Sequence, residues 1–396
     1  MQYKKLITLA LSLFFIVDYS NAYAIEAIKP PPNNINTPHY RIVLDAGNNK
    51  TRLFLYQYTQ GDTVPKNIHT LSERIHSPGV ADIAIIDLSD YLDFLFTSEL
   101  AAQIQALITD GQTNISRALL THIQFYSTEG MRLLSPQERA SKNTFIRLWL
   151  TNWVRIHNIK IPPQEIEIRT LSGSEEGAYA WVATNYSQHH FQGALTGIAK
   201  LGGSSSQITY LDPNLTNVSV KVGNTRYPLT SNNYPLGQDV IAKQLANVDA
   251  CYLTGYTNTS NGDYFSCQAQ AKAFIRTQTN MPVPNAAEVV HYNLLANFYY
   301  TAHFFGIENN YSLSSLQTQA EQFCNLNWET AKAEHTDVDE KYLANYCMGA
   351  AYQATLLTYN YHMNSFQQLS PINEFNHQEI SWPMGVIVTQ QYLEIN

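Results

Sequence analysis

Two segments far apart in this chain share one pattern, in which a glycine-containing polar loop separates two apolar runs. They are residues 41–56 (RIVLDAGNNKTRLFLY) and residues 197–210 (GIAKLGGSSSQITY). Each pattern predicts a strand, a tight loop and a returning strand. Backbone N–H groups in such a loop can converge on one anion, and glycine lets the backbone approach without a Cβ in the way. Two loops of this kind facing each other would hold a polyphosphate from both sides.

Alignment of the two loops pairs similar residues at two positions and residues of opposite charge at a third. The aligned pairs are Gly47 with Gly202, Thr51 with Ser206, and Asp45 with Lys200. The last pair places a carboxylate and an ammonium at equivalent positions, so the two halves of the predicted site are not electrically alike.

The first 24 residues are typical of an export signal. They contain two lysines, an apolar stretch at residues 6–17 and a small-x-small cleavage motif at residues 22–24. The apolar stretch is shorter than the roughly 20 residues of a membrane-spanning helix, although an uncleaved anchor is the alternative interpretation. We therefore expect an exported protein, secreted or periplasmic, without a membrane anchor. Residues 25–38 are rich in proline and asparagine and predict a flexible lead-in.

Composition limits the function classes. The formal net charge is −8 and the lysines and arginines form no cluster, so we do not expect a nucleic-acid polymer as a partner. The roughly 370 residues after the signal are enough for two domains with cores of their own. The sequence leaves the oligomeric state open.

Four cysteines lie in the second half of the chain. They are Cys251, Cys267, Cys324 and Cys347, and no two of them form a CxxC motif. In an exported protein this even number favours structural disulfides over redox or zinc sites. Pairing of nearest neighbours, Cys251 with Cys267 and Cys324 with Cys347, is the simplest of the three possible connectivities.

Predicted strands and helices alternate along the chain, which is typical of an α/β fold. Besides the two hairpins, the patterns predict strands at 118–126, 165–171 and 381–393. They predict helices at 82–109, 135–157, 178–186, 239–250, 286–305 and 342–362. The helix at 135–157 opens with Ser135 and Pro136, a typical cap followed by a first-turn proline.

The first loop combines a carboxylate with several phosphate donors. Asp45 ends an apolar strand and could bind a divalent cation through oxygen. The donors that follow are the Gly47 backbone, the Asn48 and Asn49 amides, the Lys50 ammonium and the Thr51 hydroxyl. The alternative interpretation is an ordinary hairpin turn.

Three further motifs carry groups that suit phosphate chemistry. Residues 128–132 (TEGMR) lie between a strand and a helix, where a turn can add phosphate donors. Glu176 follows a strand and opens a helix, so its carboxylate could deprotonate a water, although acidic residues at a helix start also complement the helix dipole. Residues 204–207 (SSSQ) supply hydroxyls and an amide that could orient this water, or they form only a polar hairpin tip.

Taken in order, five short motifs resemble the apyrase-conserved regions of the nucleoside triphosphate diphosphohydrolase (apyrase) family. They are DAGNNKTR, STEGMR, SGSEEGAYAW, LGGSSSQ and SWPMG, spread along the whole chain after the signal. The resemblance implies the fold of the actin and sugar-kinase superfamily, with two ribonuclease-H-like α/β lobes around a central cleft. Lobe I would comprise residues 39–169 plus 365–396, and lobe II residues 170–364.

The resemblance also implies hydrolysis of the terminal phosphate of nucleoside triphosphates, and of diphosphates, with a divalent cation such as Mg²⁺ or Mn²⁺. Glu176 would be the general base, and Ser205 and Gln207 would position the attacking water. The phosphate-binding residues would be Gly47, Asn48, Asn49, Lys50, Thr51, Thr128, Gly202, Gly203 and Ser204. Tyr352 would stack on the nucleobase, although a tyrosine there could equally belong to the core.

Several positions depart from the family pattern. The first loop has Asn48, Asn49 and Lys50 where serines and a small residue are usual, and Glu129 replaces a small residue in the second motif. The largest departure is Lys200, which stands where the family has its second metal-holding aspartate. An ammonium in place of a carboxylate weakens the binding of a hard cation.

Lys200 could pair with Asp45, bind phosphate in the place of the metal, or point away from the site. The leading hypothesis is an exported nucleotidase with an unusual metal preference. The alternative is a catalytically silent protein that binds nucleotide or polyphosphate through a degenerate metal site.

Overall fold

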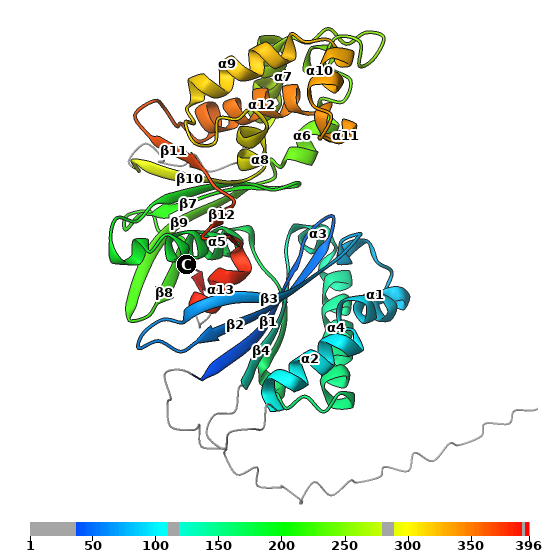
Figure 1. Ribbon diagram of the computed structural model, residues 1–396, viewed down its shortest axis with the longest axis vertical. Helices are drawn as coiled ribbons and strands as arrows, with labels where there is room; N and C mark the ends of the chain where they lie inside the picture. The colour runs from blue at the N-terminus through cyan, green and yellow to red at the C-terminus, as the bar shows by residue number, and fades with distance from the viewer. Residues whose placement is uncertain (1–36, 110–118, 279–288, 390–392, 396) are drawn as a thin grey trace, which may run out of the picture. The chain divides into compact units, whose positions relative to one another are not determined.

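The computed structural model describes residues 37–109, 119–278, 289–389 and 393–395, which form two main β-sheets with helices packed on them (Figure 1). The predicted export signal and nearly all of the predicted lead-in lie outside the described residues. Among the helices of the described residues, none is long and apolar enough to cross a membrane.

The first sheet has five strands in the order β3-β2-β1-β4-β5. Their bounds are β1 Pro38–Ala46, β2 Thr51–Thr59, β3 Lys66–His76, β4 Leu119–Ser127 and β5 Ile166–Thr170. The first three strands form an antiparallel meander, and β4 and β5 run parallel to β1. Central strand β1 carries the apolar run Ile42–Val43–Leu44, which is fully buried because helices or other strands cover both faces of the sheet.

Helices pack on one face of the first sheet. They are α1 Leu88–Leu95, α2 Ser98–Thr109 and α4 Pro136–Ile156, with the short α3 Glu129–Leu133 after β4. The predicted helix at 82–109 is two helices, preceded by two 3₁₀ turns and interrupted near Phe96. Helix α4 begins as predicted, with a capping box in which the Ser135 hydroxyl and the Glu138 side chain satisfy each other's backbone N–H groups.

The second sheet has seven strands in the order β11-β10-β6-β7-β9-β8-β14. Their bounds are β6 Gly197–Leu201, β7 Ser206–Leu211, β8 Val218–Val222, β9 Thr225–Tyr234, β10 His291–Ala296, β11 Gln368–Pro371 and β14 Glu394–Ile395. The prediction of one helix at 286–305 is wrong over its middle, because residues 291–296 form β10 between β6 and β11 and only Asn297–Phe304 form helix α8. A short apolar run suits a buried strand and a buried helix equally well.

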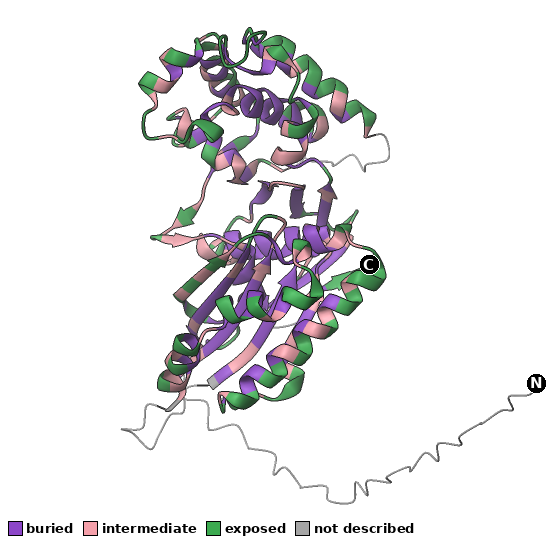
Figure 2. Ribbon diagram, turned by 90° about the vertical axis from the view of Figure 1, so that its right-hand side faces the viewer, coloured by how far each residue is buried: buried purple, intermediate pink, exposed green. Residues whose placement is uncertain are grey.

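A buried helix pair lies next to the second sheet. Helix α5, Gly173–Ser187, contacts β7 and β9 on one side and helix α13, Trp382–Thr389, on the other. The predicted strand at 381–393 is therefore wrong over residues 382–389. All residues of α13 are buried, so it has no polar face from which helical periodicity could be recognised. Figure 2 shows that strand interiors are largely buried, whereas outward helix faces are exposed.

The remaining helices form a cluster that follows the second sheet in the chain. Their bounds are α6 Gln238–Gln244, α7 Tyr264–Thr277, α9 Leu313–Cys324, α10 Trp328–Glu334, α11 Glu340–Leu343 and α12 Tyr346–Thr355. The predicted helices at 239–250 and 342–362 correspond to α6, which ends at Gln244, and to α11 and α12 followed by a π-helical turn. The disulfides Cys251–Cys267 and Cys324–Cys347 join this cluster and confirm the predicted pairing.

Two strands near the C-terminus differ from the predicted lobe assignment. Strand β11 pairs with β10, and β14 pairs with β8, so both belong to the seven-stranded sheet. We expected the segment 365–396 to join lobe I, whose sheet contains β1–β5. The other lobe boundaries stay a prediction.

Candidate active site

The two glycine loops have the same local geometry. Ala46 pairs with Thr51 across the first hairpin, and Leu201 pairs with Ser206 across the second, so each loop contains four residues. In the first loop the backbone N–H of Gly47 donates to the carbonyl of Lys50 at 2.9 Å. In the second loop the backbone N–H of Gly202 donates to the carbonyl of Ser205, also at 2.9 Å. The predicted strand–loop–strand repeat is therefore present, and Asp45 and Lys200 occupy equivalent strand positions.

Asp239 connects the two loops. Its backbone N–H donates to the carbonyl of Gly203 at 2.7 Å, where the start of α6 packs against the second loop. Its carboxylate accepts a hydrogen bond from the side-chain amide of Asn49 in the first loop at 2.9 Å. The loops therefore lie close enough for one residue, Asp239, to hydrogen-bond to both.

Of the two adjacent glutamates in the first turn of α5, the local geometry selects Glu176 for the site. Glu175 accepts from the backbone N–H of Ser172 at 2.8 Å in a capping box and forms an ion pair with Arg169 at 2.8 Å. Glu176 is one residue further round the helix and is 5% exposed. Glu175 is thus committed to the helix start, and Glu176 turns toward other cations.

Glu176 lies between two cations that come from different elements. Its Oε1 accepts from Nζ of Lys200 on β6 at 2.6 Å, and its Oε2 accepts from Nη1 of Arg132 in α3 at 3.2 Å. Burial acts to raise the pKa of Glu176, but Lys200 and Arg132 outweigh it, and the pKa lies below the ordinary value. Glu176 is therefore ionised at neutral pH and able to accept a proton.

The structure contradicts two of the three predicted arrangements of Lys200, and the third, direct binding of phosphate, stays a prediction. Lys200 neither pairs with Asp45 nor points away, but forms an ion pair with Glu176. Arg132, the last residue of the second motif, was not predicted to contact the site. The signal that could have identified Arg132 is an arginine one turn into a short helix that follows a predicted phosphate-binding turn.

Asp45 lies close to this cluster at the end of β1. The pKa of Asp45 is raised to about 6, because burial and the nearby Glu176 carboxylate raise it by more than Lys200 and Arg52 lower it. A hydrogen bond with Trp382 also lowers this pKa, so the fifth motif reaches the site through Trp382. The first, second, third, fourth and fifth motifs therefore meet around one group of charges.

Ser205 and Gln207 form a buried polar pair beside the charges. The side-chain amide of Gln207 donates to Oγ of Ser205 at 2.9 Å and to Oδ1 of Asn233 at 2.8 Å. Oε1 of Gln207 is buried and has no hydrogen-bonding partner among the described residues. Glu129 hydrogen-bonds with Ser205, and burial raises the pKa of Glu129 despite this bond. Such a set can orient a water molecule.

The predicted phosphate-binding residues fall into three groups by exposure. Asn49 and Lys50 are exposed. The partly buried residues are Gly47, Asn48, Gly202, Gly203 and Ser204. By contrast, Thr51 is fully buried and accepts a hydrogen bond from the Tyr91 hydroxyl at 2.8 Å. Thr128 is buried and its N–H donates to the carbonyl of Ala46 at 3.0 Å.

The structure does not support the predicted role of Tyr352 in stacking on a nucleobase. Its side chain has no exposed surface, and its hydroxyl donates to the carbonyl of Leu236 at 2.7 Å. It packs in the core between the second sheet and the helical cluster. Tyr352 is therefore a core residue, which was the alternative interpretation.

The side chains at the site offer few ligands to the divalent cation that the resemblance implies. Mg²⁺ usually keeps several waters and is bound through one or two carboxylates together with substrate phosphates. Among the described residues, no three His, Cys, Asp or Glu side chains are grouped to hold a metal ion. Asp45 supplies one carboxylate, whereas the equivalent position supplies the ammonium of Lys200.

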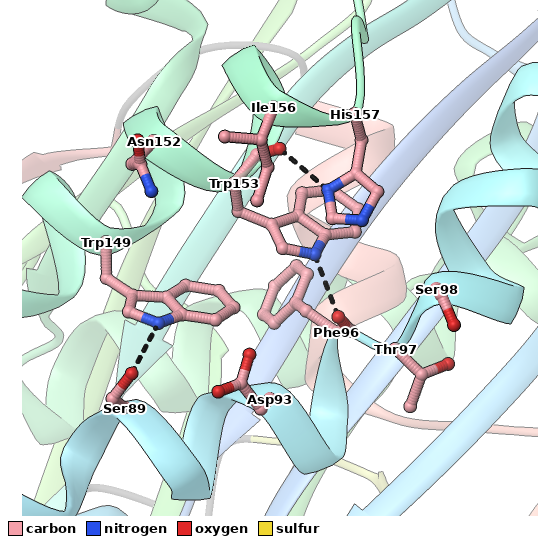
Figure 3. Close-up of a pocket in the computed structure, with 10 residues that line it drawn as sticks. All are labelled: Ser89, Asp93, Phe96, Thr97, Ser98, Trp149, Asn152, Trp153, Ile156 and His157. Atoms are coloured by element: carbon pink, nitrogen blue, oxygen red, sulfur yellow. Dashed lines mark hydrogen bonds between the residues drawn. The ribbon is translucent and has the colours of Figure 1, made fainter.

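A separate pocket of about 530 Å³ opens between helices α1, α2 and α4 (Figure 3). Its lining residues are Ser89, Asp93, Phe96, Thr97, Ser98, Trp149, Asn152, Trp153, Ile156 and His157. The indole N–H groups of Trp149 and Trp153 donate to Ser89 Oγ and to the Phe96 carbonyl. None of the predicted site residues lines this pocket.

Comparison with known proteins assigns the chain to a family. The GDA1/CD39 (nucleoside phosphatase) family matches residues 33–240 and 237–394. The chain belongs to the GDA1/CD39 family. It is thus an enzyme of the nucleoside phosphatase class, as the five motifs predicted.

An ectonucleoside triphosphate diphosphohydrolase and a probable apyrase are similar to the chain over most of its length. Ectonucleoside triphosphate diphosphohydrolase 1 of Rattus norvegicus is 23% identical over 95% of this chain and 86% of its own. Probable apyrase 3 of Arabidopsis thaliana is 24% identical over 80% of this chain and 74% of its own.

Solved structures confirm the fold of this family member. The nucleoside triphosphate hydrolase of Neospora caninum has a TM-score of 0.61 at 13% identity, covering 89% of this chain and 92% of its own. The Ppx/GppA family member of Aquifex aeolicus has a TM-score of 0.51 at 12% identity, covering 89% and 97%. These likenesses confirm the predicted fold class, an α/β fold with helices packed on two sheets.

Proposed function

We propose that this family member hydrolyses the terminal phosphate of nucleoside triphosphates and that Glu176 is its general base. The observation that carries the proposal is the position of Glu176. This buried carboxylate is ionised by Lys200 and Arg132 and shares the site with the Ser205–Gln207 pair. Nucleoside diphosphates are a second substrate class, since the same loops would bind their terminal phosphate.

In this mechanism, Gln207 and Ser205 hold the attacking water. The unpartnered Oε1 of Gln207 would accept one of its hydrogens, and Glu176 would accept the proton that is lost as the water oxygen bonds to the terminal phosphorus. The bond from phosphorus to the bridging oxygen breaks, and the nucleoside diphosphate leaves with the electron pair. The products are inorganic phosphate and a nucleotide shorter by one phosphate.

The rest of the site would position the substrate. The Gly47 and Gly202 loops present backbone and amide donors from two sides, and Lys50 adds an exposed ammonium. Lys200 and Arg132 would stabilise the negative charge on the transferred phosphoryl oxygens, which is where most catalysis of phosphoryl transfer arises. No step in this proposal depends on a metal ligand of the protein.

We also propose that the protein acts outside the cytoplasm. The predicted export signal and the two disulfides support a secreted or periplasmic location. Extracytoplasmic nucleotides would then be its substrates.

The test is phosphate release from ATP and ADP by the mature chain and its Glu176→Gln variant. Loss of a general base slows turnover by about 10² to 10⁴. The matched control is Glu329→Gln, since the Glu329 side chain is 80% exposed on α10 and distant in sequence from every motif. A folded Glu176→Gln variant with full activity would contradict the role of Glu176, and a wild-type chain that binds nucleotide without releasing phosphate would contradict the proposed function.

A further inference from the structure

The site contains two cations whose contacts leave donor groups unused. Nζ of Lys200 has three N–H donors, and the hydrogen bond to Glu176 at 2.6 Å uses one of them. Nη1 of Arg132 contacts Glu176 and the Leu171 carbonyl, whereas Nη2 is buried without a partner among the described residues. A buried guanidinium nitrogen without an acceptor is costly, and an anion that reached it would remove this cost.

The position of Lys200 in the repeat indicates which anion. Lys200 stands in the second hairpin where Asp45 stands in the first, one residue before the strand end that leads into the glycine loop. The loop residues Gly202–Ser204 follow directly, and Asp239 joins them to the first loop. An anion between the two loops would therefore lie within reach of the Lys200 ammonium.

We propose that Lys200 and Arg132 bind the terminal phosphate of the nucleotide directly, and that Lys200 supplies the positive charge for which a protein-held divalent cation would otherwise be needed. In the structure, Glu176 is the anion that both cations contact. Phosphate oxygens would take over the donors of Lys200, and this exchange would leave Glu176 Oε1 free to accept the proton of the water.

The charges of the site support this exchange. The Lys200 side chain is 18% exposed and that of Arg132 is 17% exposed, so a ligand could reach both, whereas the Glu176 side chain is 7% exposed. Hydrogen bonds between ionised partners are roughly twice as strong as neutral ones, and a phosphate offers three oxygens where Glu176 offers two. The inference deepens the proposed function, on which it rests for the identity of the ligand.

The experiment measures nucleotide binding and not turnover, so a result that contradicts this inference can be told apart from one that contradicts the proposed hydrolysis. Isothermal titration calorimetry of the mature chain with the non-hydrolysable β,γ-imido analogue of ATP is carried out in excess EDTA and then in Mg²⁺. The variants are Lys200→Met and Lys200→Asp, and the control is Lys221→Met at an exposed position on β8. Thermal unfolding establishes that each variant is folded.

We expect the wild-type chain to bind the analogue in EDTA, with an affinity that Mg²⁺ changes by less than about threefold. Lys200→Met should weaken this binding by about 10- to 100-fold, the value of a hydrogen bond to a charged group, and Lys221→Met should not. Lys200→Asp should bind poorly in EDTA and recover with Mg²⁺.

Three results would overturn the inference. They are a wild-type chain that loses the analogue in EDTA, one that binds it under neither condition, and a folded Lys200→Met variant that binds it as tightly as the wild type. Binding without phosphate release would leave the inference standing and contradict the proposed hydrolysis instead.

Discussion

At the level of single residues, two adjacent glutamates have different roles because their side chains contact different partners. Glu175 and Glu176 are adjacent, but the first closes a capping box and the second meets Lys200 and Arg132. The sequence could predict that a glutamate at this helix start faces the site, because an acidic pair follows a strand. It could not predict the partner of Lys200, since Lys200 and Glu176 lie on separate elements and their contact depends on how α5 packs on the second sheet.

Tyr352 shows the same limit. An aromatic residue in a helix suits both a core and a base-stacking surface, and only packing decides between them. The complete burial of Tyr352 and its bond to the Leu236 carbonyl assign it to the core.

The raised pKa of Asp45 predicts a pH-dependent gain in stability for Asp45→Asn. Because the folded-state pKa, about 6, lies above the ordinary aspartate value of 3.8, ionised Asp45 costs stability at neutral and alkaline pH. This cost declines as the pH falls from 6 toward 4, and it disappears where the group is protonated in both states. We therefore expect Asp45→Asn to raise Tm at pH 8 and to raise it far less at pH 4.

Thermal unfolding of Asp45→Asn across this pH range measures the effect, and Asp62→Asn at an exposed loop position is the control. A gain that is equally large at pH 4 and pH 8 would show that titration of Asp45 is not its cause.

At the level of elements, small residues set how closely the helices approach their neighbours. A Cβ on Gly177 would lie 2.6 Å from Ser231 Oγ and 2.6 Å from Thr209 Oγ1, both on strands of the second sheet. A Cβ on Gly385 would lie 2.0 Å from the Tyr179 carbonyl, where α13 meets α5. Helix α5 is therefore held tightly on both sides, and Glu176 is fixed with it.

Most hairpins and helices were predictable from the sequence because their patterns are local. The glycine loops, the Ser135 cap of α4 and the start of α5 depend on residues within a few positions of one another. Strand β10 and helix α13 were not predictable from the sequence, because both are short apolar runs that are almost entirely buried. Such a run has no polar face, and without one the period of a helix cannot be told from that of a strand.

Gly177→Ala tests the coupling between packing and the site. The added methyl would meet the Ser231 and Thr209 hydroxyls, so α5 or these side chains must shift, at a cost of about 1–3 kcal/mol of folding free energy. A shift of α5 would displace the adjacent Glu176. We expect a lower denaturation midpoint together with a lower kcat. Gly193→Ala is the control, because a Cβ at Gly193 meets no atom within 4 Å. If Gly177→Ala retains full stability and kcat, the close packing does not fix Glu176.

At the level of the whole molecule, contacts between distant segments hold the chain together. Arg52 on β2 forms ion pairs with Glu73 at 2.7 Å and with Glu379 at 2.5 Å, more than 300 residues later. The Arg41 guanidinium donates to the Val386 carbonyl in α13 at 3.2 Å.

The two-lobed fold was predictable from the order of the five motifs. The pairing of β11 and β14 with the second sheet was not predictable, because short strands carry too little pattern to specify a partner.

Both disulfides lie in the helical cluster, so their loss should weaken that part of the molecule. The bridged cysteines are 16 and 23 residues apart, and closing loops of this size stabilises by about 3 kcal/mol each. We expect Cys251→Ser/Cys267→Ser and Cys324→Ser/Cys347→Ser each to lower the free energy of unfolding by about this amount in guanidinium titrations. Equal stability of the reduced and oxidised wild-type chain would contradict this expectation.

The central claim is that a water activated by Glu176 attacks the terminal phosphorus. The measurement that tests it most directly is ATP hydrolysis in ¹⁸O-labelled water by the wild-type chain and by Glu176→Gln, with mass analysis of both products. We expect the label in the released phosphate and not in ADP, and a rate about 10² to 10⁴ lower in the variant. Label in ADP, or equal rates for the two folded proteins, would contradict the claim.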